Sequence, residues 1–247
     1  MSEQLVFELA PPEAPSFANF LAGDNGEVLE ALTRIANGTA TETGLLVWGA
    51  PGSGKSHLLR ATAAACGARS QRAVALPAPD SLEGREIDEL ASHHLVAVDA
   101  VDTADAHAQG RLFTLFNALA AQGRHLVAAS RVPPARMAVR EDLRTRLGWG
   151  LVYEITPLAD HAKPAALIAY ARQRGFRLAP DVVRYLLAHG RRDMATLLAT
   201  LAALDRHSLA TKRPVTIPLL RAWLQGELPA AGAAENADRI SSVSKKE

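Results

Sequence analysis

The chain has 247 residues and carries 27 Lys and Arg against 26 Asp and Glu, for a formal net charge of +1. A balance this even excludes a strongly basic field, so non-specific wrapping of nucleic acid is not expected as the main activity. The single cysteine, Cys66, excludes an intrachain disulfide and a cysteine-based zinc site. The start lacks the basic and apolar regions of a signal peptide, and no apolar run approaches about 18 residues, so we expect a cytoplasmic protein without a membrane span.

The N-terminal residues 1–15 differ in composition from the rest of the chain. Residues 4–9 form a short, mostly apolar peptide, and prolines follow it up to position 15. Because proline lacks the amide donor and disfavours helix in the residue before it, this peptide is expected to lie outside the folded core. Residues 17–38 then predict a loop followed by a helix, since apolar residues recur at helical spacing from Val28 onward.

An α/β pattern runs from residue 16 to residue 157. Short apolar runs of the kind found in buried strands occur at residues 45–48, 73–76, 95–98, 126–129 and 151–155. Helical segments are predicted between them, at residues 56–66, 112–119 and 142–147. Strands that alternate with helices imply right-handed crossovers and a parallel sheet. The sequence therefore predicts an α/β nucleotide-binding domain over residues 16–157.

The pattern changes after Pro157. Residues 158–226 carry helical periodicity and no strand-like run, with helices predicted at residues 166–174, 180–189, 193–208 and 217–224. This part is expected to be a small, all-helical domain. Residues 227–247 are rich in Ala, Gly, Ser and charge, and we expect a disordered tail there.

The segment after the first predicted strand carries the full phosphate-loop motif G-x-x-x-x-G-K-[ST]. Its residues are Gly49, Ala50, Pro51, Gly52, Ser53, Gly54, Lys55 and Ser56. Glycines let the backbone curl around an anion with its N–H groups inward, and the following helix adds the positive end of its dipole. Lys55 would reach the β- and γ-phosphates, while the Ser56 hydroxyl would bind magnesium. The motif predicts a site for ADP or ATP with magnesium.

A nucleotide site of this kind needs an acidic residue at the end of a neighbouring strand. Asp99 directly follows the predicted strand 95–98 and would hold the magnesium through water. Many hydrolases of this class carry a second carboxylate at the next position, where this chain has Ala100. Asp102 lies nearby, but a turn leaves the direction of its side chain open. Intrinsic ATP hydrolysis is therefore expected to be weak or absent.

For three further polar residues, the sequence allows both a functional and a purely structural interpretation. Ser130 follows a predicted strand and is either a sensor of the γ-phosphate or an ordinary serine at a strand end. Arg146 lies in a helical segment ahead of the last strand, where spacing alone favours a solvated surface arginine over a finger for a neighbouring subunit. Arg192 begins a predicted helix of the second domain, and its position alone indicates an ordinary surface charge.

Together these segments resemble the AAA+ ATPases and, within them, the DnaA family. Residues 19–25 and 54–59 are similar to that family's adenine-binding entry and phosphate loop, which adds His57 to the expected nucleotide-binding residues. Residues 142–150, 174–176 and 204–209 are similar to the Hda-type, DnaA-homologous regulatory inactivators. The resemblance covers residues 4–225 and implies an AAA+ parallel-sheet domain with a helical lid.

The resemblance also implies roles for individual residues. Arg146 matches the family's arginine finger, which acts in trans on nucleotide bound to a partner, and Arg192 matches its second sensor. The N-terminal peptide resembles a motif that binds the polymerase sliding clamp through Gln4, Leu5, Phe7 and Leu9, with Phe7 where the family usually has Leu. An aromatic side chain also fills an apolar pocket, so clamp binding is expected over a plain disordered start.

The implied function is regulatory inactivation of the replication initiator DnaA. The nucleotide-bound protein, on a DNA-loaded clamp, would stimulate hydrolysis of ATP on DnaA, and contact DNA only indirectly. Two alternatives stay open, namely an ATPase similar to helicase loaders and a passive adaptor between clamp and initiator. The choice between ADP and ATP and the formation of a homo-oligomer also stay open.

Overall fold

The computed structural model describes residues 14–191, 193–211 and 214–225. These residues belong to two compact units, one from Ala14 to Leu158 and the other beginning at Ala159. Within the described ranges, no helix has the length and apolar character needed to cross a membrane. The predicted clamp-binding residues Gln4, Leu5, Phe7 and Leu9, the predicted sensor Arg192 and the predicted tail lie outside these ranges.

The first unit is built on a five-stranded parallel sheet in the order β2-β3-β4-β1-β5. The strands are β1 (Gly44–Trp48), β2 (Ala73–Leu76), β3 (Leu95–Val98), β4 (His125–Ser130) and β5 (Leu151–Glu154). This confirms the predicted α/β class with a parallel sheet. Because β1 lies between β4 and β5, the chain reverses its direction of winding beside the carboxyl end of β1, where open α/β sheets bind ligands.

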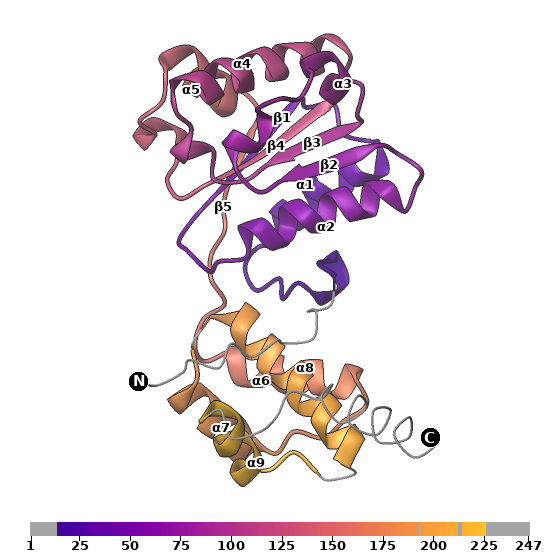
Figure 1. Cartoon of the computed structure of the whole chain (residues 1–247), viewed down its shortest axis with the longest axis vertical. Helices are drawn as coiled ribbons and strands as arrows, with labels where there is room; N and C mark the ends of the chain where they lie inside the picture. The colour runs from indigo at the N-terminus through magenta and orange to yellow at the C-terminus, as the bar shows by residue number, and fades with distance from the viewer. Residues whose placement is uncertain (1–13, 192, 212–213, 226–247) are drawn as a thin grey trace, which may run out of the picture. The chain divides into compact units, whose positions relative to one another are not determined.

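Helices cover both faces of this sheet (Figure 1). One face carries α1 (Gly26–Asn37) and α2 (Lys55–Gly67). The other carries α3 (Ile87–Ala91), α4 (Ala106–Ala121) and α5 (Glu141–Gly148). Short 3-10 turns lie at Phe17–Asn19, Pro79–Leu82, Val101–Thr103 and Pro134–Arg136.

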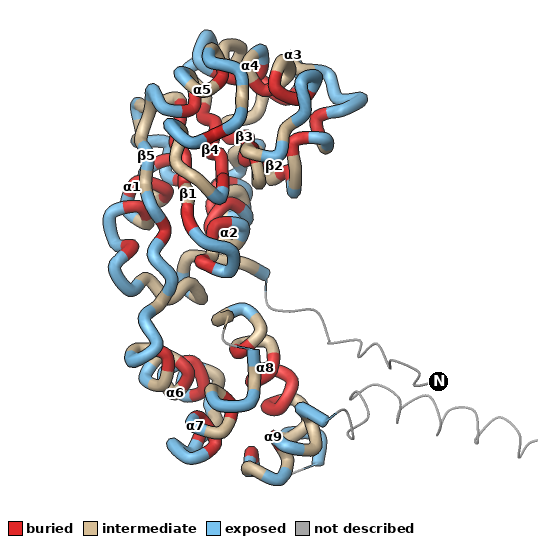
Figure 2. The backbone as a smooth tube through the Cα atoms, turned by 90° about the vertical axis from the view of Figure 1, so that its left-hand side faces the viewer, coloured by how far each residue is buried: buried red, intermediate tan, exposed pale blue. Residues whose placement is uncertain are grey.

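The alternation of side chains along the strands divides the core into two halves. In β1, Leu46 packs with the half that contains Leu112 and Leu115 of α4, whereas Leu45 and Val47 pack with the α1 and α2 half. Both halves are buried, and Figure 2 shows the central strands as the continuous buried part of the unit. A sheet covered on both faces explains why its strands read as uninterrupted apolar runs.

Two helices of this unit differ from the sequence prediction. Helix α4 begins at Ala106, six residues before the predicted start at Leu112, because the Asp105 carboxylate caps it by accepting a hydrogen bond from the Ala108 N–H at 2.8 Å. Helix α3 was not predicted, since its five residues are too few to show helical periodicity.

The second unit contains four described helices around its own apolar core. They are α6 (Lys163–Gln173), α7 (Pro180–His189), α8 (Met194–Thr211) and α9 (Ile217–Leu224). Leu167, Leu186 and Leu201 lie at the centre of the core. Gly190 after α7 is required by close packing, since a Cβ there would lie 2.7 Å from the Leu186 carbonyl oxygen. The all-helical character predicted for this region is confirmed.

Candidate functional site

The phosphate loop connects the carboxyl end of β1 to the start of α2. Two of its glycines stand where no other residue fits. Gly49 has a φ of +153°, and a Cβ there would lie 2.6 Å from the Ile155 carbonyl oxygen. Gly54 has a φ of +104°, and its Cβ would lie 2.6 Å from the ring of Phe20. The loop conformation therefore depends on glycine for both backbone freedom and close packing.

The first turn of α2 has the features that suit it to binding an anion. Gly54 is the N-cap residue and has no side chain to accept hydrogen bonds from the first N–H groups of the helix. These groups have no partner inside the helix, and the helix dipole places partial positive charge at the same end. The backbone from Gly54 to Ser56 can thus donate to a phosphate without any side-chain rearrangement.

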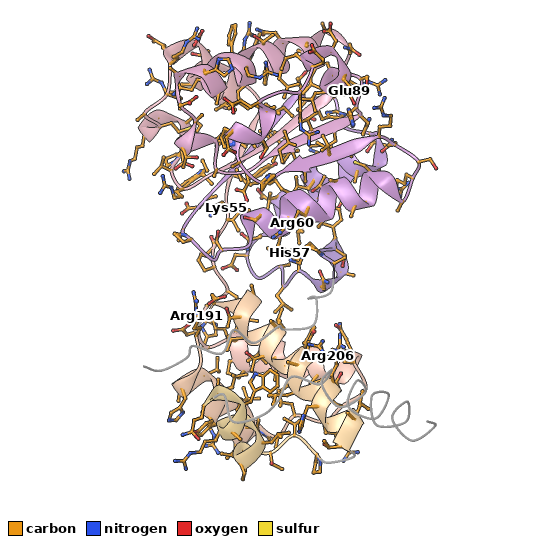
Figure 3. The ribbon with its side chains drawn as sticks, viewed as in Figure 1. Lys55, His57, Arg60, Glu89, Arg191 and Arg206 are labelled. Atoms are coloured by element: carbon orange, nitrogen blue, oxygen red, sulfur yellow. The ribbon has the colours of Figure 1, made fainter. Side chains whose placement is uncertain are left out.

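Lys55 is folded back onto the loop that it belongs to. Its Nζ donates to the carbonyl oxygens of Gly49 and Ala50, both at 2.8 Å, and the side chain is buried. Burial lowers the pKa of Lys55, and the nearby carboxylates of Asp99 and Asp102 oppose that shift. Figure 3 shows Lys55 at the start of α2. The third N–H of the ammonium group makes only a long contact of 3.4 Å with Ser53 Oγ and is the donor available to a phosphate.

Ser56 and Asp99 line the same cavity. It has a volume of about 260 Å³ and is also lined by Arg60, Leu76 and Pro77. One oxygen of Asp99, Oδ1, accepts a hydrogen bond from the Ala100 N–H at 2.8 Å. A hydroxyl and a carboxylate are the oxygen donors with which Mg²⁺ is held beside a nucleotide, where phosphate and water complete its coordination. The residues that the structure brings together here therefore fit the predicted magnesium site.

The position after Asp99 has an unusual backbone conformation. Ala100 lies in the left-handed region, with a φ of +52°. A methyl side chain stands where a second carboxylate would be needed to orient water. Asp102 is the other carboxylate that the sequence analysis considered for this role. Its Oδ2 accepts a hydrogen bond from Arg131 Nε at 2.7 Å, so Asp102 is already paired.

Ser130 is the last residue of β4 and lies next to the phosphate loop. The Gly49 N–H donates to the Ser130 carbonyl oxygen at 3.3 Å. The Ser130 hydroxyl is buried and donates to the Val132 carbonyl oxygen at 2.6 Å, so it is turned toward the loop that follows β4. A role as phosphate sensor stays a prediction and requires this side chain to rotate.

His57 and Phe20 form a small contact behind the phosphate loop. The two rings lie 5.6 Å apart between centroids, and His57 Nε2 donates to the Ser16 carbonyl oxygen at 2.9 Å. Burial lowers the pKa of His57, and its hydrogen bond to the Ser16 carbonyl opposes that shift. His57 thus ties the segment before α1 to α2, and Figure 3 shows it on the first turn of that helix.

Arg146 lies in the last turn of α5, beside Gly44 at the amino end of β1, whereas the phosphate loop follows the carboxyl end of that strand. Its guanidinium carbon is 4.6 Å from the centroid of the Trp149 ring and 5.9 Å from those of Phe113 and Phe116. Among the residues that the structure describes, no carboxylate lies within 4.0 Å of its nitrogens. Arg146 is half-buried, and its guanidinium carries five N–H donors.

Sequence reasoning assigned no individual role to three residues that shape this site, although two of them lie in the segment 19–25. Phe20 packs against Gly54, Arg131 holds Asp102, and Asn25 exchanges hydrogen bonds of 2.9 Å with the backbone of Thr156 beyond β5. The signal for Asn25 was its place just before a predicted helix, which indicates a cap. Its side chain instead bridges two segments far apart in sequence, which no local pattern reveals.

Comparisons with known proteins agree with this architecture. Residues 160–224 match the family model described as Hda, lid domain. Domain III of the Thermotoga maritima replication initiation protein DnaA is similar with a TM-score of 0.70 and 19% identity, over 86% of this chain and 95% of that chain. AMPPCP-bound DnaA from Aquifex aeolicus gives a TM-score of 0.67 and 21% identity, over 81% of this chain and 67% of that chain.

Another solved structure, at lower identity, has a similar fold as well. The Thermotoga maritima RuvB Holliday junction branch migration motor gives a TM-score of 0.61 at 12% identity, over 85% of this chain and 71% of that chain. Identities this low concern the fold alone. Residues 160–224 thus match the Hda lid-domain family, and the chain as a whole has the fold of the DnaA-like AAA+ proteins.

Proposed function

We propose that this protein is a nucleotide-bound regulator of the replication initiator DnaA. Together with the sliding clamp loaded on DNA, it stimulates hydrolysis of the ATP bound to DnaA and so restrains re-initiation of chromosomal replication. The proposal combines two capacities of the chain: it holds a nucleotide of its own, and it offers an arginine to a nucleotide held by its partner.

The phosphate loop supports the first capacity. The N-terminal N–H groups of α2 and the Lys55 ammonium bind the phosphates of ADP or ATP, while Ser56 and Asp99 hold magnesium. When bound, magnesium neutralises phosphate charge. The chain's own residues then keep the nucleotide in place rather than activating water, since Ala100 has no carboxylate and Asp102 is engaged by Arg131.

The proposal rests mainly on the surroundings of the Arg146 side chain. A partly exposed guanidinium with no carboxylate in reach among the described residues is suited to meet a phosphoryl group from outside. Charge builds on the oxygens of that group during hydrolysis, and an arginine that neutralises it raises the rate. Arg146 thus acts in trans on ATP bound to DnaA, while the chain's own hydrolysis is weak or absent.

The N-terminal peptide accounts for the roles of the clamp and of DNA in this proposal. Gln4, Leu5, Phe7 and Leu9, which lie outside the described residues, dock on the sliding clamp, and DNA is contacted only through that clamp. Docking places Arg146 near DnaA by raising its effective concentration on the same DNA. The proposal requires no membrane partner, and it holds for a monomer as well as for a homo-oligomer.

Reconstitution separates the proposal from its two alternatives. DnaA is loaded with radiolabelled ATP and incubated with this protein, the clamp and DNA, and then with each component left out in turn. We expect hydrolysis on DnaA to accelerate only in the complete mixture, while this protein alone turns over little ATP. Rapid ATP turnover by this protein alone would favour the loader-like ATPase, and no acceleration in the complete mixture would reject the proposal.

A further inference from the structure

Arg146 lies among three aromatic rings that come from two elements. Phe113 and Phe116 lie on α4, and Trp149 follows the end of α5, one turn beyond Arg146. All three ring centroids are within 6 Å of the guanidinium carbon, and Trp149 is nearest at 4.6 Å. A cation is attracted to the face of an aromatic ring at such distances, most strongly to indole.

Trp149 is the exposed member of this group. Its side chain is 70% exposed and stands at the edge of a cavity of about 580 Å³, which Phe113 and Arg146 also line. An indole this exposed contributes little to the buried core. The ring contact that the structure shows for it is the one with Arg146.

A competing partner for Arg146 lies on the same helix. Asp142 precedes Arg146 by four residues, a spacing and order that favour an ion pair along a helix. Asp142 is instead engaged by its neighbours, because its Oδ2 accepts a hydrogen bond from Arg140 Nη2 at 2.6 Å and its Oδ1 accepts one from the Leu143 N–H at 2.8 Å. Asp142 is thus paired with Arg140, and among the described residues no ion pair joins it to Arg146.

An aromatic ring and a carboxylate differ in which part of the Arg146 guanidinium they leave free. A ring stacked on the guanidinium uses its face, whereas a carboxylate binds the N–H groups at its edge. Those N–H groups are the ones that would donate to the oxygens of a phosphoryl group. An Arg146 held by Trp149 therefore keeps its donors, and one paired with Asp142 would lose them.

We propose that Trp149 and Arg140 are positioning residues for Arg146. Trp149 fixes the guanidinium by its face, and Arg140 holds Asp142 away from it, so that the N–H edge stays ready for nucleotide on the partner. This inference rests on the proposed function, in which Arg146 serves DnaA-bound ATP.

The test for Arg140 is a substitution and its rescue. In the reconstituted hydrolysis assay, Arg140→Ala should lower the maximal stimulated rate by about fivefold to tenfold, because Asp142 is released to pair with Arg146. Arg140→Ala combined with Asp142→Asn should restore the rate, since the competing charge is gone. Arg136→Ala removes an exposed arginine of the neighbouring turn and should have no effect. Failure of Asp142→Asn to restore the rate would overturn this half of the inference.

The test for Trp149 separates positioning from docking. Trp149→Ala should lower the maximal rate by about fivefold while the concentration for half-maximal stimulation changes little, and Trp149→Phe should keep most of the rate. Leu209→Ala, which removes another exposed apolar side chain, is the matched control. A changed half-maximal concentration with an unchanged maximal rate would show that Trp149 docks the partner and would overturn its positioning role.

Arg146→Ala, measured in the same assay, distinguishes failure of the positioning inference from failure of the proposed function on which it rests. If Arg146→Ala keeps full stimulation, the proposed function fails and the inference fails with it. If Arg146→Ala abolishes stimulation while Arg140→Ala and Trp149→Ala keep the wild-type rate, the inference alone is wrong.

Discussion

Asp102 and Arg131 join the segments that follow β3 and β4. Arg131 donates to Asp102 from its side chain, with Nε 2.7 Å from Oδ2, and from its backbone, with N 3.3 Å from Oδ1. The Asp102 side chain is 5% exposed, whereas that of Arg131 is 61% exposed, so the carboxylate is the buried member of the pair. A carboxylate held by both contacts is poorly placed to accept a proton from water at the neighbouring site.

The first prediction concerns this pair. Asp102→Asn keeps the shape of the side chain and removes its charge, so the free energy of unfolding should fall by about 1 kcal/mol. The protein's own ATP hydrolysis should stay within about twofold of wild type, since Asp102 is not the group that activates water. Urea unfolding and a steady-state ATPase assay measure the two quantities. A hundredfold loss of hydrolysis with the fold intact would identify Asp102 as the base.

The second prediction concerns the backbone at Ala100. A left-handed conformation costs an L-residue roughly 1–2 kcal/mol and costs glycine little. Ala100→Gly should therefore raise the free energy of unfolding by about 0.5–1 kcal/mol, less than the full strain because glycine gains more freedom when unfolded. Ala104→Gly, at a φ of −61°, is the control and should be destabilising. Equal destabilisation by both substitutions would argue against strain at Ala100.

The third prediction concerns the phosphate loop. Lys55→Ala should weaken ADP and ATP binding by about tenfold or more, because a charge-assisted contact with phosphate is lost. Isothermal titration measures the affinity. Arg69→Ala, an exposed cation just beyond the other end of α2, should leave it unchanged. Unchanged affinity in Lys55→Ala would mean that nucleotide binds elsewhere or not at all.

Much of this fold could be predicted because local pattern and buried environment agree. The strands β1 and β3 lie within one residue of their predicted bounds, since a strand buried on both faces has no polar interruption. The phosphate loop was found from spacing alone, because its glycines meet requirements of the backbone itself, at Gly49 and Gly54. These features are decided by residues adjacent in the chain.

Other features depend on contacts between distant residues and could not be predicted. The hydrogen bond between Asp102 and Arg131 joins positions 29 residues apart. The rings around Arg146 come from α4 and from Trp149, which follows α5. The sequence named Asp102 and Arg146 as candidates but left the direction of both side chains open. Their surroundings follow from the packing of α4, α5 and the sheet, which no local pattern contains.

The fourth prediction concerns the N-terminal peptide. Gln4→Ala combined with Leu5→Ala should abolish co-elution with the sliding clamp, because the polar contact and one apolar anchor are lost together. Ordering an extended peptide costs free energy, so the isolated peptide should bind more weakly than the full chain on DNA-loaded clamp. Glu8→Ala, within the same peptide, is the matched control and should bind as wild type. Undiminished co-elution of the double substitution would show that the clamp contacts another surface.

The fifth prediction is the central one, that Arg146 acts on nucleotide held by DnaA and not on its own. Arg146 has no ion pair among the described residues, so Arg146→Ala should change the free energy of unfolding by no more than about 1 kcal/mol. Its own nucleotide affinity and its clamp binding should match wild type. These controls make a loss of stimulation attributable to the guanidinium.

The most direct measurement is hydrolysis of ATP bound to DnaA, with clamp and DNA present, for wild type and Arg146→Ala side by side. The finger role predicts that the substitution removes most of the stimulation, since such arginines contribute about 10³–10⁵ in rate in related systems. Stimulation that survives the substitution would contradict the account and leave a passive adaptor between clamp and initiator. Loss of stimulation together with loss of nucleotide binding would also contradict it, because Arg146 would then serve this protein's own site.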